Sequence, residues 1–458
     1  MTTATIDRVE RLLRTGADGP AAPGLDAHLA VHGPLTIPRK DDRNWSHAIW
    51  AEVAAAGLTG RGGGGFPAAA KWDAVTKSAR RPLVVVNAME GEPASAKDRT
   101  LLAWSPHLVL DGAEVAAALC GAREIIVCVA DDRDPGARAV ERAIAERGSA
   151  RRGSAGRGIA ISVARPPARY VTGEESALVS WLDQRDARPA LRIDKSTPLR
   201  VGRRPVLLHN TETLAQVALI ARHGAAWFRQ MGTPEAPGTT LVTVSGAVRT
   251  PGVIEVALGT PVDELIARVG TTGPIGGLLL GGYGGAWLDP ARMTVPFAPG
   301  PLAAAGATLG VGIVVVLPTS SCGIAETARI ARYMAGESAG QCGPCVFGLP
   351  AVAEDLELLA SGRAKADVLA RIEDRCGSIE GRGACRHPDG VVRMIRSALA
   401  VFGADARDHA SGRPCAAHGA STILQFPSAP SAPSARSARS APSAPSAAMA
   451  PSAVRSAW

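Results

Sequence analysis

Residues 60–72 read GRGGGGFPAAAKW, and residues 82–93 read PLVVVNAMEGEP. The first stretch is a glycine-rich loop that opens a helix, predicted over 68–77, and a second helix is predicted before the loop, over 45–58. The second stretch begins with a buried strand at 82–87. These elements predict an α/β domain whose ligand binds at the carboxyl end of the strand, as in open α/β sheets.

The glycine loop has two interpretations. Gly60, Gly62 and Gly65 spell G-x-G-x-x-G, the dinucleotide-binding fingerprint. A helix precedes them, so the strand-loop-helix context of that fingerprint is missing. The sequence therefore predicts only a non-standard Rossmann-like domain. Five glycines in six positions still let backbone N–H groups approach an anion, and Lys71 follows on the first turns of the helix. The alternative is a flexible loop without a ligand.

Further along, the pattern changes twice. A helix at 113–120 and strands at 124–129 and 158–163 continue the α/β alternation, whereas residues 241–318 carry short strands and glycine turns around one helix, which predicts a small α+β module. Helical apolar spacing then predicts a bundle that contains five of the eight cysteines, with helices at 325–335, 351–360, 366–373 and 391–402. The last 33 residues repeat Ser-Ala-Pro and are predicted to be disordered.

Composition excludes several classes of protein. The chain has 458 residues, enough for about three domains at roughly 150 residues each. Its 46% hydrophobic and 20% charged residues are typical of a globular protein, and neither an apolar run of spanning length nor a secretory signal is found, so a cytoplasmic protein is predicted. The net charge of +8 comes mainly from 44 dispersed arginines, and only 17 aromatic residues accompany them, which argues against nucleic-acid binding.

Three polar segments accompany the glycine loop. NAMEGEPASAKDR at 87–99 follows the strand and holds Glu90 and Glu92, YVTGEE covers 170–175, and HNTET covers 209–213. Taken singly, the first is equally consistent with a solvated turn with local ion pairs, and the last with the N-cap of a helix predicted over 214–223.

As an ordered set, the four segments resemble the NADH-binding flavoprotein subunit of respiratory complex I, which is the F subunit of NADH-quinone oxidoreductase, and its relatives in soluble hydrogenases and formate dehydrogenases. The family pattern reads G-R-G-G-x-G-F-P-x-x-x-K-W, N-A-D-E-x-E-P-G-x-x-K-D-R, Y-x-x-G-E-E-T-A-L and N-x-E-T. This chain has GRGGGGFPAAAKW, NAMEGEPASAKDR, YVTGEESAL and NTET, and the resemblance runs from about residue 58 to residue 402.

The resemblance implies a set of site residues. In that family the glycine loop and its lysine hold the phosphate of FMN, and the other segments surround the flavin. Carried over, the FMN-binding residues are Gly62, Gly63, Gly65, Lys71, Asn87, Glu90, Tyr170, Gly173, Glu174, Asn210 and Thr213. Glu92 and Glu175 are expected where NADH reacts, and Cys342, Cys345 and Cys385 are expected to hold an iron–sulfur cluster of the [4Fe–4S] type.

The resemblance also implies the domain organisation. The expected parts are an N-terminal segment 1–44, an FMN- and NADH-binding α/β domain 45–238, a β-grasp domain of the soluble-ligand-binding type 239–318, a helical iron–sulfur domain 319–412 and a disordered tail 413–458. A thioredoxin-fold iron–sulfur subunit, a ferredoxin or another dehydrogenase subunit is the expected partner.

The cluster motif departs from the family. The usual E-S-C-G-x-C-x-x-C is here ESAGQCGPC, so Ala339 stands where the first thiolate is expected, while a cubane normally has four cysteine ligands. Cys322, Cys376 or His387 are candidates for the missing ligand, and a three-iron or open-cornered cluster is an alternative. A zinc site of Cys342, Cys345, Cys385 and His387, or a Cys-Gly-Pro-Cys dithiol, is also consistent with the sequence.

The motifs expected to bind the nucleotide also differ from the family pattern. Met89 replaces the aspartate of N-A-D-E, and Ala74 stands where the family carries a phenylalanine that packs on the nucleotide. Two functions therefore remain open: an NADH dehydrogenase-like flavoprotein that passes electrons through FMN to a cluster, with the donor open, and a scaffold subunit that keeps the fold without redox chemistry.

Overall fold

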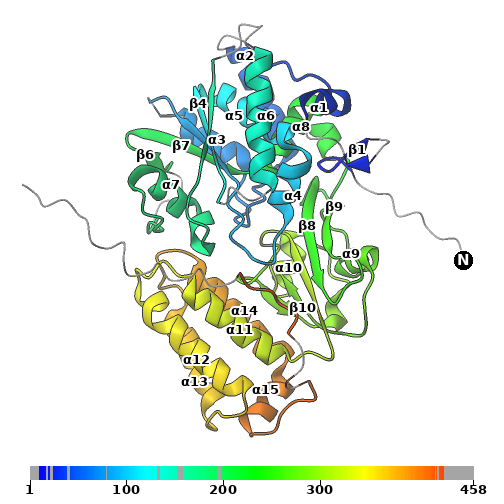
Figure 1. The fold of residues 1–458 in the computed structure, drawn as a ribbon, viewed down its shortest axis with the longest axis vertical. Helices are drawn as coiled ribbons and strands as arrows, with labels where there is room; N and C mark the ends of the chain where they lie inside the picture. Colours follow the sequence, from blue (N-terminus) through cyan, green and yellow to red (C-terminus); the bar gives the residue numbers. More distant parts are fainter. Residues whose placement is uncertain are drawn as a thin grey trace, which may run out of the picture. The chain divides into compact units, whose positions relative to one another are not determined.

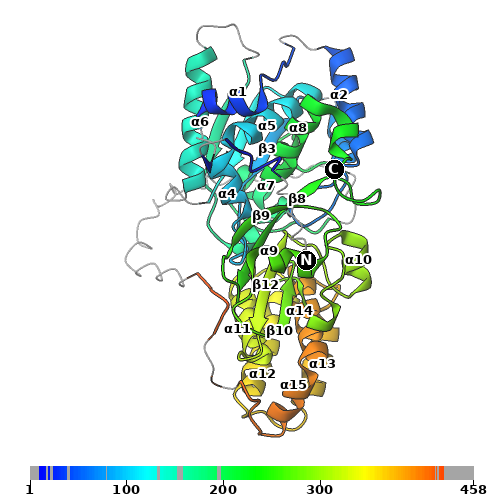
Figure 2. The ribbon, with the colours of Figure 1, turned by 90° about the vertical axis from the view of Figure 1, so that its right-hand side faces the viewer.

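The computed structural model describes residues 10–16, 19–20, 24–38, 42–78, 80–130, 135–151, 158–192, 197–417, 419 and 422–427. These residues form two five-stranded sheets and a set of C-terminal helices, shown in Figure 1 and, turned by 90°, in Figure 2. Most of the tail that the sequence predicts as disordered lies outside the described residues. Within the described part of the chain, no helix is both long and apolar enough to cross a membrane.

The first sheet is an open α/β sheet with the order β5-β4-β3-β7-β6, in which β6 alone pairs antiparallel. Val84 and Val86 of β3 pack into one core, and Leu83 and Val85 pack into the core on the opposite face. This alternation is typical of a strand that is buried on both sides. The strands are β3 (Leu83–Asn87), β4 (Glu124–Cys128), β5 (Ala160–Ala164), β6 (Arg200–Val201) and β7 (Arg204–Asn210).

Helices cover the two faces unequally. The larger core is built with α2 (Arg43–Ala56), α3 (Ala68–Thr76), α4 (Lys97–Trp104), α5 (Pro106–Cys120), α6 (Pro135–Arg151) and α8 (Thr211–Phe228). The other face is covered by α7 (Glu175–Gln184), through Leu178 and Val179. A helix α1 (Leu25–His32) and a short hairpin of β1 (Thr15–Gly16) and β2 (Gly19–Pro20) precede this domain.

Helices α5 and α8 are in backbone contact at Gly112. A Cβ atom on this residue would lie 1.8 Å from the carbonyl oxygen of Leu214, so only glycine fits here. Leu214 belongs to the first turns of α8, which begins directly after β7. This contact therefore fixes where the start of α8 lies against the rest of the domain.

The second sheet has the order β11-β10-β12-β8-β9, and only the central pair β12 and β8 is parallel. Its apolar face packs on the amphipathic helix α9 through Leu265 and Ile266. The elements are β8 (Thr239–Gly246), β9 (Gly252–Ala257), α9 (Val262–Val269), β10 (Ile275–Leu280), β11 (Ala286–Leu288), α10 (Pro299–Ala304) and β12 (Ile313–Pro318). This mixed α+β arrangement agrees with the module predicted from the glycine turns.

The C-terminal region consists of five helices: α11 (Gly323–Gly336), α12 (Leu349–Ala360), α13 (Val368–Ile379), α14 (His387–Val401) and α15 (Gly403–Ala410). It packs against the second sheet (Figure 2). There the Trp287 and Phe402 rings meet edge to face, with their ring centres 5.1 Å apart. Helix α15 was not predicted from the sequence.

The compact unit continues to Gln425, beyond the predicted start of the tail at residue 413. The backbone N–H groups of Ile423 and Leu424 donate to the buried carboxylate of Glu326 on α11, and the Tyr283 hydroxyl donates to the carbonyl oxygen of Gln425 at 2.6 Å. The buried carboxylate of Glu326 and the Tyr283 hydroxyl therefore hold backbone that lies after the expected tail boundary at 413.

Candidate functional site

The glycine loop is closed at its base by backbone hydrogen bonds. Gly60 N–H donates to the Phe66 carbonyl and Ala68 N–H donates to the Leu58 carbonyl, both at 2.9 Å. Residues 62–65 between them are exposed. The loop therefore has a fixed base and a tip that faces solvent.

A buried arginine anchors this base. The backbone N–H of Arg61 donates to the hydroxyl of Thr213 at 2.9 Å, and its guanidinium donates to Thr59 and to the carbonyl of Pro237. Burial lowers the pKa of Arg61, while the carboxylate of Glu212, 4.0 Å away, raises it. Thr213, which the resemblance assigns to FMN, is itself fully buried and holds the loop from beneath.

The tip of the loop offers hydrogen-bond donors to a ligand. Among the described residues, no hydrogen bond uses the N–H groups of residues 62–65. A Cβ atom on Gly64 or Gly65 would meet nothing within 4 Å, whereas one on Gly62 would lie 3.2 Å from the Asn210 Cβ. Exposed N–H groups beside a lysine are the donor set that a phosphate group binds, so this loop fits the phosphate of FMN.

Lys71 lies beside the loop on α3. Its Nζ donates to the Leu208 carbonyl at 3.0 Å and forms an ion pair with Glu175 at 2.9 Å, with about a quarter of the side chain exposed. The next residue, Trp72, donates from its indole to Nε2 of His209 at 2.8 Å. Burial, followed by the charge of Lys71, lowers the pKa of His209, so this imidazole is neutral and accepts the bond.

The predicted residues after β3 are engaged with the backbone. The Asn87 amide donates to the Gly173 carbonyl at 2.9 Å and accepts from the N–H of Met89. Glu90 accepts hydrogen bonds from the backbone N–H groups of Asp98 and Arg99, at 3.0 and 3.2 Å. It therefore caps helix α4 from a position eight residues earlier in the sequence than Asp98. The segment carries the local ion pairs of the solvated-turn interpretation, Lys97–Asp98 and Arg99–Glu90, but it is not solvated, because Arg99 is its only exposed residue.

The start of α8 carries a buried charged cluster that the sequence did not single out. The Lys97 ammonium lies 2.7 Å from Asp98, 3.1 Å from the amide oxygen of Asn210 and 3.1 Å from Glu212. Burial alone would lower the pKa of Lys97, but the carboxylates of Asp98 and Glu212 raise it above its ordinary value. Asn210 also caps α8 by accepting the N–H of Glu212, which confirms the predicted N-cap.

Tyr170 and Glu174 lie on a turn that faces both the first sheet and the helical region. A Cβ atom on Gly173 of this turn would lie 3.0 Å from the Met89 carbonyl, and Glu174 caps α7 by accepting the Ala177 N–H at 2.9 Å. The Tyr170 N–H donates to Glu337 at 2.8 Å. The turn is thus held at both ends, by the segment after β3 and by the segment that leads to Cys342.

Glu92 and Glu175, the two predicted catalytic acids, occupy different environments. Glu175 is partly exposed beside Lys71, whereas Glu92 is buried and accepts the N–H of Tyr283 at 2.8 Å. The Tyr170 hydroxyl also donates to Glu92. Burial raises the pKa of Glu92 to about 7, against the lowering effect of these hydrogen bonds.

The three predicted cluster cysteines lie within electrostatic range of one another. Cys345 lies on a π-helical turn, Pro344–Gly348, and its N–H donates to the Cys342 carbonyl at 3.0 Å. Burial raises the pKa of the Cys345 thiol to about 12, and the thiols of Cys342 and Cys385 add to this effect. Burial also raises the pKa of Cys385 to about 11, with a contribution from Glu174, so the turn around Tyr170 lies within electrostatic range of this thiol.

The zinc alternative is not supported. In the part of the chain that the structure describes, Cys342, Cys345 and Cys385 do not gather within 4.8 Å of one another, as the ligands of one ion would. His387 instead donates from Nε2 to the Met334 carbonyl at 2.8 Å. The dithiol alternative also fails, because helix α11 precedes the Cys-Gly-Pro-Cys segment where a thioredoxin-like motif follows a strand.

Two cysteines are candidates for the missing ligand. Cys322 lies 3.7 Å from Nε2 of His409, and Cys376 is fully buried on α13. Of the isolated cysteines, Cys120 and Cys128 are core residues as predicted, and burial raises the pKa of both thiols to about 12.

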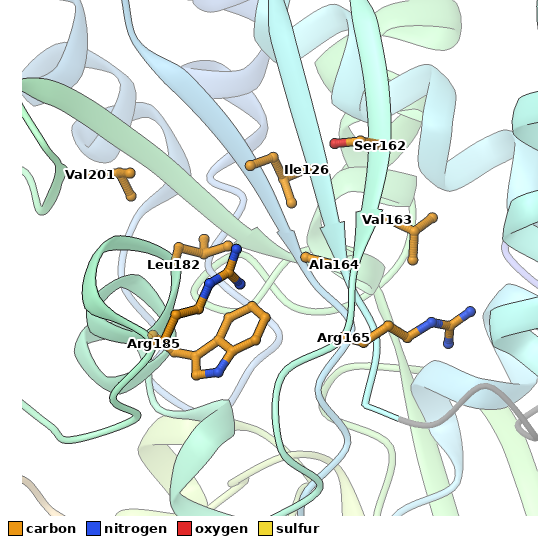
Figure 3. A pocket seen from close by; sticks show the side chains of 9 residues that line it. Ile126, Ser162, Val163, Ala164, Arg165, Leu182, Arg185 and Val201 are labelled. Carbon is orange, nitrogen blue, oxygen red and sulfur yellow. The ribbon is translucent and has the colours of Figure 1, made fainter. Parts of the chain in front are cut away.

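A separate hollow of about 430 Å³ is lined by residues of α7 and of the strands β4, β5 and β6. Figure 3 shows Arg165 and Arg185 on either side of it. The Arg185 guanidinium lies 4.4 Å from the ring centre of Trp181. The lining of this hollow shares no residue with the predicted flavin or cluster sites.

Comparison with known families agrees with this arrangement. The family model described as "Nuo51 FMN-binding domain" matches residues 53–219, "SLBB domain" matches 241–272, and "NADH-ubiquinone oxidoreductase-F iron-sulfur binding region" matches 325–409. The predicted cofactors, FMN and a [4Fe–4S] cluster, are thereby confirmed.

Individual proteins give the same result. The chain is 33% identical over 377 residues to the F 2 subunit of NADH-quinone oxidoreductase from Rhizobium meliloti, and the match covers 80% of this chain and 89% of the relative. It is 30% identical to the F subunit of the same enzyme from Streptomyces coelicolor, with 80% and 83% covered. Among solved structures, a chain of an NAD⁺-reducing [NiFe]-hydrogenase in the air-oxidised state matches with a TM-score of 0.73 and 31% identity, over 80% of this chain and 63% of that one.

These matches confirm the resemblance that the four ordered segments predicted, and the roles of single residues stay predictions. The chain belongs to the family of NADH-quinone oxidoreductase F subunits.

Proposed function

We propose that this protein oxidises NADH and passes the electrons through FMN to an iron–sulfur cluster and on to a partner carrier. The observation that carries the proposal is the turn around Tyr170. It is tied to the segment after β3 through the bond from Asn87 to Gly173 and to the cluster segment through the bond from Tyr170 to Glu337. One rigid element therefore joins the flavin side to the cluster side.

FMN, when bound, accepts a hydride and releases its electrons singly, which is the chemistry that joins a two-electron donor to a one-electron cluster. The N–H groups of residues 62–65 and the ammonium of Lys71 would hold its phosphate. Asn87, Glu90, Glu174 and Asn210 use their polar atoms to fix the surrounding backbone. Their role in this proposal is to shape the wall of the flavin site, with Gly63, Tyr170, Gly173 and Thr213.

The nucleotide would approach over the exposed tip of the loop. Phe66, which the sequence motifs did not single out, is 42% exposed there and offers an aromatic surface. Glu175 lies partly exposed beside Lys71, where it can accept hydrogen bonds from the ribose or amide of a dinucleotide. Met89 is buried, so the missing carboxylate of N-A-D-E is replaced by an apolar contact.

Cys342, Cys345 and Cys385 would bind the cluster through three thiolates. Ala339 supplies no ligand, so one iron would carry a ligand other than cysteine or be absent. A scaffold function without redox groups is not favoured, because both cofactor-binding regions are matched. The proposed acceptor is an iron–sulfur subunit of thioredoxin fold, a ferredoxin or another dehydrogenase subunit.

The test is a visible spectrum with flavin and iron analysis on anaerobically purified protein, before and after addition of NADH. The expected result is flavin absorbance that is bleached by NADH in protein that also contains iron. Lys71→Ala should weaken FMN retention at least about tenfold, which corresponds to the loss of one charge-assisted hydrogen bond. Lys77→Ala, an exposed lysine at the end of the same helix, is the matched control. Protein without flavin and iron after reconstitution would overturn the proposal.

A further inference from the structure

Three side chains of metal-binding type converge away from the predicted cluster. The sulfur atoms of Cys322 and Cys415 and a ring nitrogen of His409 all lie within 4.8 Å of one another. Cys322 Sγ lies 3.7 Å from His409 Nε2. Across the residues that the structure describes, no other group of three cysteine, histidine or acidic side chains is so closely spaced.

The three residues come from three different segments. Cys322 is the N-cap of α11, His409 lies in the last turn of α15, and Cys415 follows that helix. All three are buried, with exposed fractions of 5%, 0% and 8%. Buried thiols and imidazoles that meet at one point without an acidic neighbour in the group form a soft ligand set rather than an ion pair.

We propose that Cys322, His409 and Cys415 bind a Zn²⁺ ion. Zinc bonds of about 2.3 Å to sulfur and 2.0–2.1 Å to nitrogen, at tetrahedral angles, place sulfur and nitrogen about 3.6 Å apart and two sulfurs about 3.8 Å apart. The observed 3.7 Å between Cys322 and His409 already agrees with this spacing. The fourth position would hold a water molecule.

Charge balance favours the same ion. Both thiols release their protons to solvent when the metal binds, and the two thiolates cancel the charge of Zn²⁺, so the buried site is neutral. The N–H of Ala325 points at the Cys322 sulfur from 3.4 Å, and the N-terminal end of α11 stabilises a thiolate at this position. Such N–H contacts support metal-bound sulfur.

The ion would fasten the C-terminal segment to the molecule. Downstream of Cys415, Ile423 is held by Glu326, and Arg329 donates to the Leu424 carbonyl at 3.0 Å. Glu326 and Arg329 lie on α11, the helix that Cys322 begins. A zinc site would therefore attach the C-terminal segment to α11 at Cys415, and the hydrogen bonds from Glu326 and Arg329 attach it at Ile423 and Leu424.

The experiment is metal analysis and zinc X-ray absorption on the full-length holoprotein after anaerobic purification. We expect one zinc per chain, with two sulfur ligands at about 2.3 Å and one nitrogen ligand at about 2.0–2.1 Å. Cys415→Ala and His409→Gln should each reduce the zinc content at least tenfold while flavin and iron stay unchanged. Cys120→Ala, which removes a buried thiol on α5, should retain zinc.

Three results would overturn the proposal: wild-type protein without zinc, zinc that persists in Cys415→Ala, or absorption that shows three or four sulfur ligands. Mass spectrometry that finds a Cys322–Cys415 disulfide in the anaerobic protein would replace the metal site by a redox bond. The absorption measurement needs no variant, so it decides the question even where a substitution prevents folding. Flavin and iron are measured on the same samples, so failure of the proposed electron transfer is recognised separately.

Discussion

The glycine-loop region and the cysteine-rich helical region differ in how their polar groups are satisfied. Around the loop, Asn87, Glu90 and Glu174 already make hydrogen bonds to backbone, and the open donors are the N–H groups of residues 62–65. In the helical region, Cys345 and Cys385 are thiols whose pKa burial raises to about 12 and 11.

This difference indicates that a metal centre would stabilise the helical region more than FMN would stabilise the glycine-loop region. The glycine-loop region is assembled by its own hydrogen bonds, so FMN would bind a preformed loop there. The cysteine-rich region places thiols in surroundings that disfavour thiolates, so a metal centre supplies the positive charge that those surroundings lack. Loss of the cluster should therefore disturb the helical region more than loss of FMN disturbs the loop.

The largest expected effect comes from Cys345→Ala. Removal of one of three thiolates should eliminate most of the iron and lower NADH-driven reduction of a one-electron iron acceptor at least about a hundredfold, whereas flavin is retained because its site is separate. Iron analysis and stopped-flow reduction measure both. Cys376→Ala, a buried thiol in the same region, is the control, and equal iron loss there would contradict the assigned ligand set.

The next effect is expected from Ala339→Cys, which restores the family motif. A fourth thiolate should raise the iron content toward four per chain and slow the loss of cluster absorbance in air several-fold, because each [4Fe–4S] iron then has a cysteine ligand. Electron paramagnetic resonance of the reduced protein reports the cluster type. Unchanged iron content and spectra would show that another group already occupies this corner.

A smaller effect is expected on the pH dependence of the free energy of unfolding, through Glu92. Its buried carboxylate accepts the Tyr283 N–H. Its pKa is about 7 in the fold against an ordinary 4.5, so the folded state binds more protons than the unfolded state between these values. The contribution of Glu92 to the free energy of unfolding should therefore be highest below about pH 4.5. It should fall as the pH rises to 7 and stay constant at higher pH.

Glu92→Gln should remove this slope, because the amide stays neutral. At pH 8 the variant should be more stable than the wild type by at most about 3 kcal/mol, measured by urea unfolding at pH 5, 6, 7 and 8. An identical pH dependence in both proteins would mean that Glu92 is ionised in the fold.

The smallest effect is expected from Phe66→Ala on the glycine loop. Loss of one stacking ring should raise the KM for NADH about 2- to 10-fold and leave FMN content unchanged, since an aromatic contact contributes about 0.5–1.5 kcal/mol. Phe347→Ala, a ring that is 76% exposed beside Cys345, should leave this KM unchanged. Equal KM values for Phe66→Ala and wild type would exclude Phe66 from the nucleotide site.

Local patterns were enough to predict the frame of the molecule. The buried strand at 82–87, the glycine loop and the helix after it are observed within one residue of their predicted bounds. Local apolar periodicity determines such elements, because each buries its own face. Helix α4 was not predicted, since its first N–H groups are capped by Glu90, eight residues before Asp98, and no nearby side chain signals its start.

The site was predicted less completely, for a related reason. The structure brings some residues of different motifs into contact, such as Asn87 and Gly173, but the motifs could not separate side chains that would touch a ligand from those that hold the backbone, such as Glu174 and Thr213. The buried cluster around Lys97 and the group of Cys322, His409 and Cys415 depend on contacts between residues about 90 to 115 positions apart. No spacing rule covers such distances along the chain.

Gly112 determines the position of the glycine loop indirectly. At Gly112 the backbones of α5 and α8 are in direct contact, so α8 cannot move closer to α5. The start of that helix carries Asn210 and Thr213, and Thr213 in turn holds Arg61 under the glycine loop. Because a Cβ atom on Gly112 would lie 1.8 Å from the Leu214 carbonyl oxygen, Gly112→Ala would displace the start of α8, and the displacement would reach the glycine loop through Thr213 and Arg61.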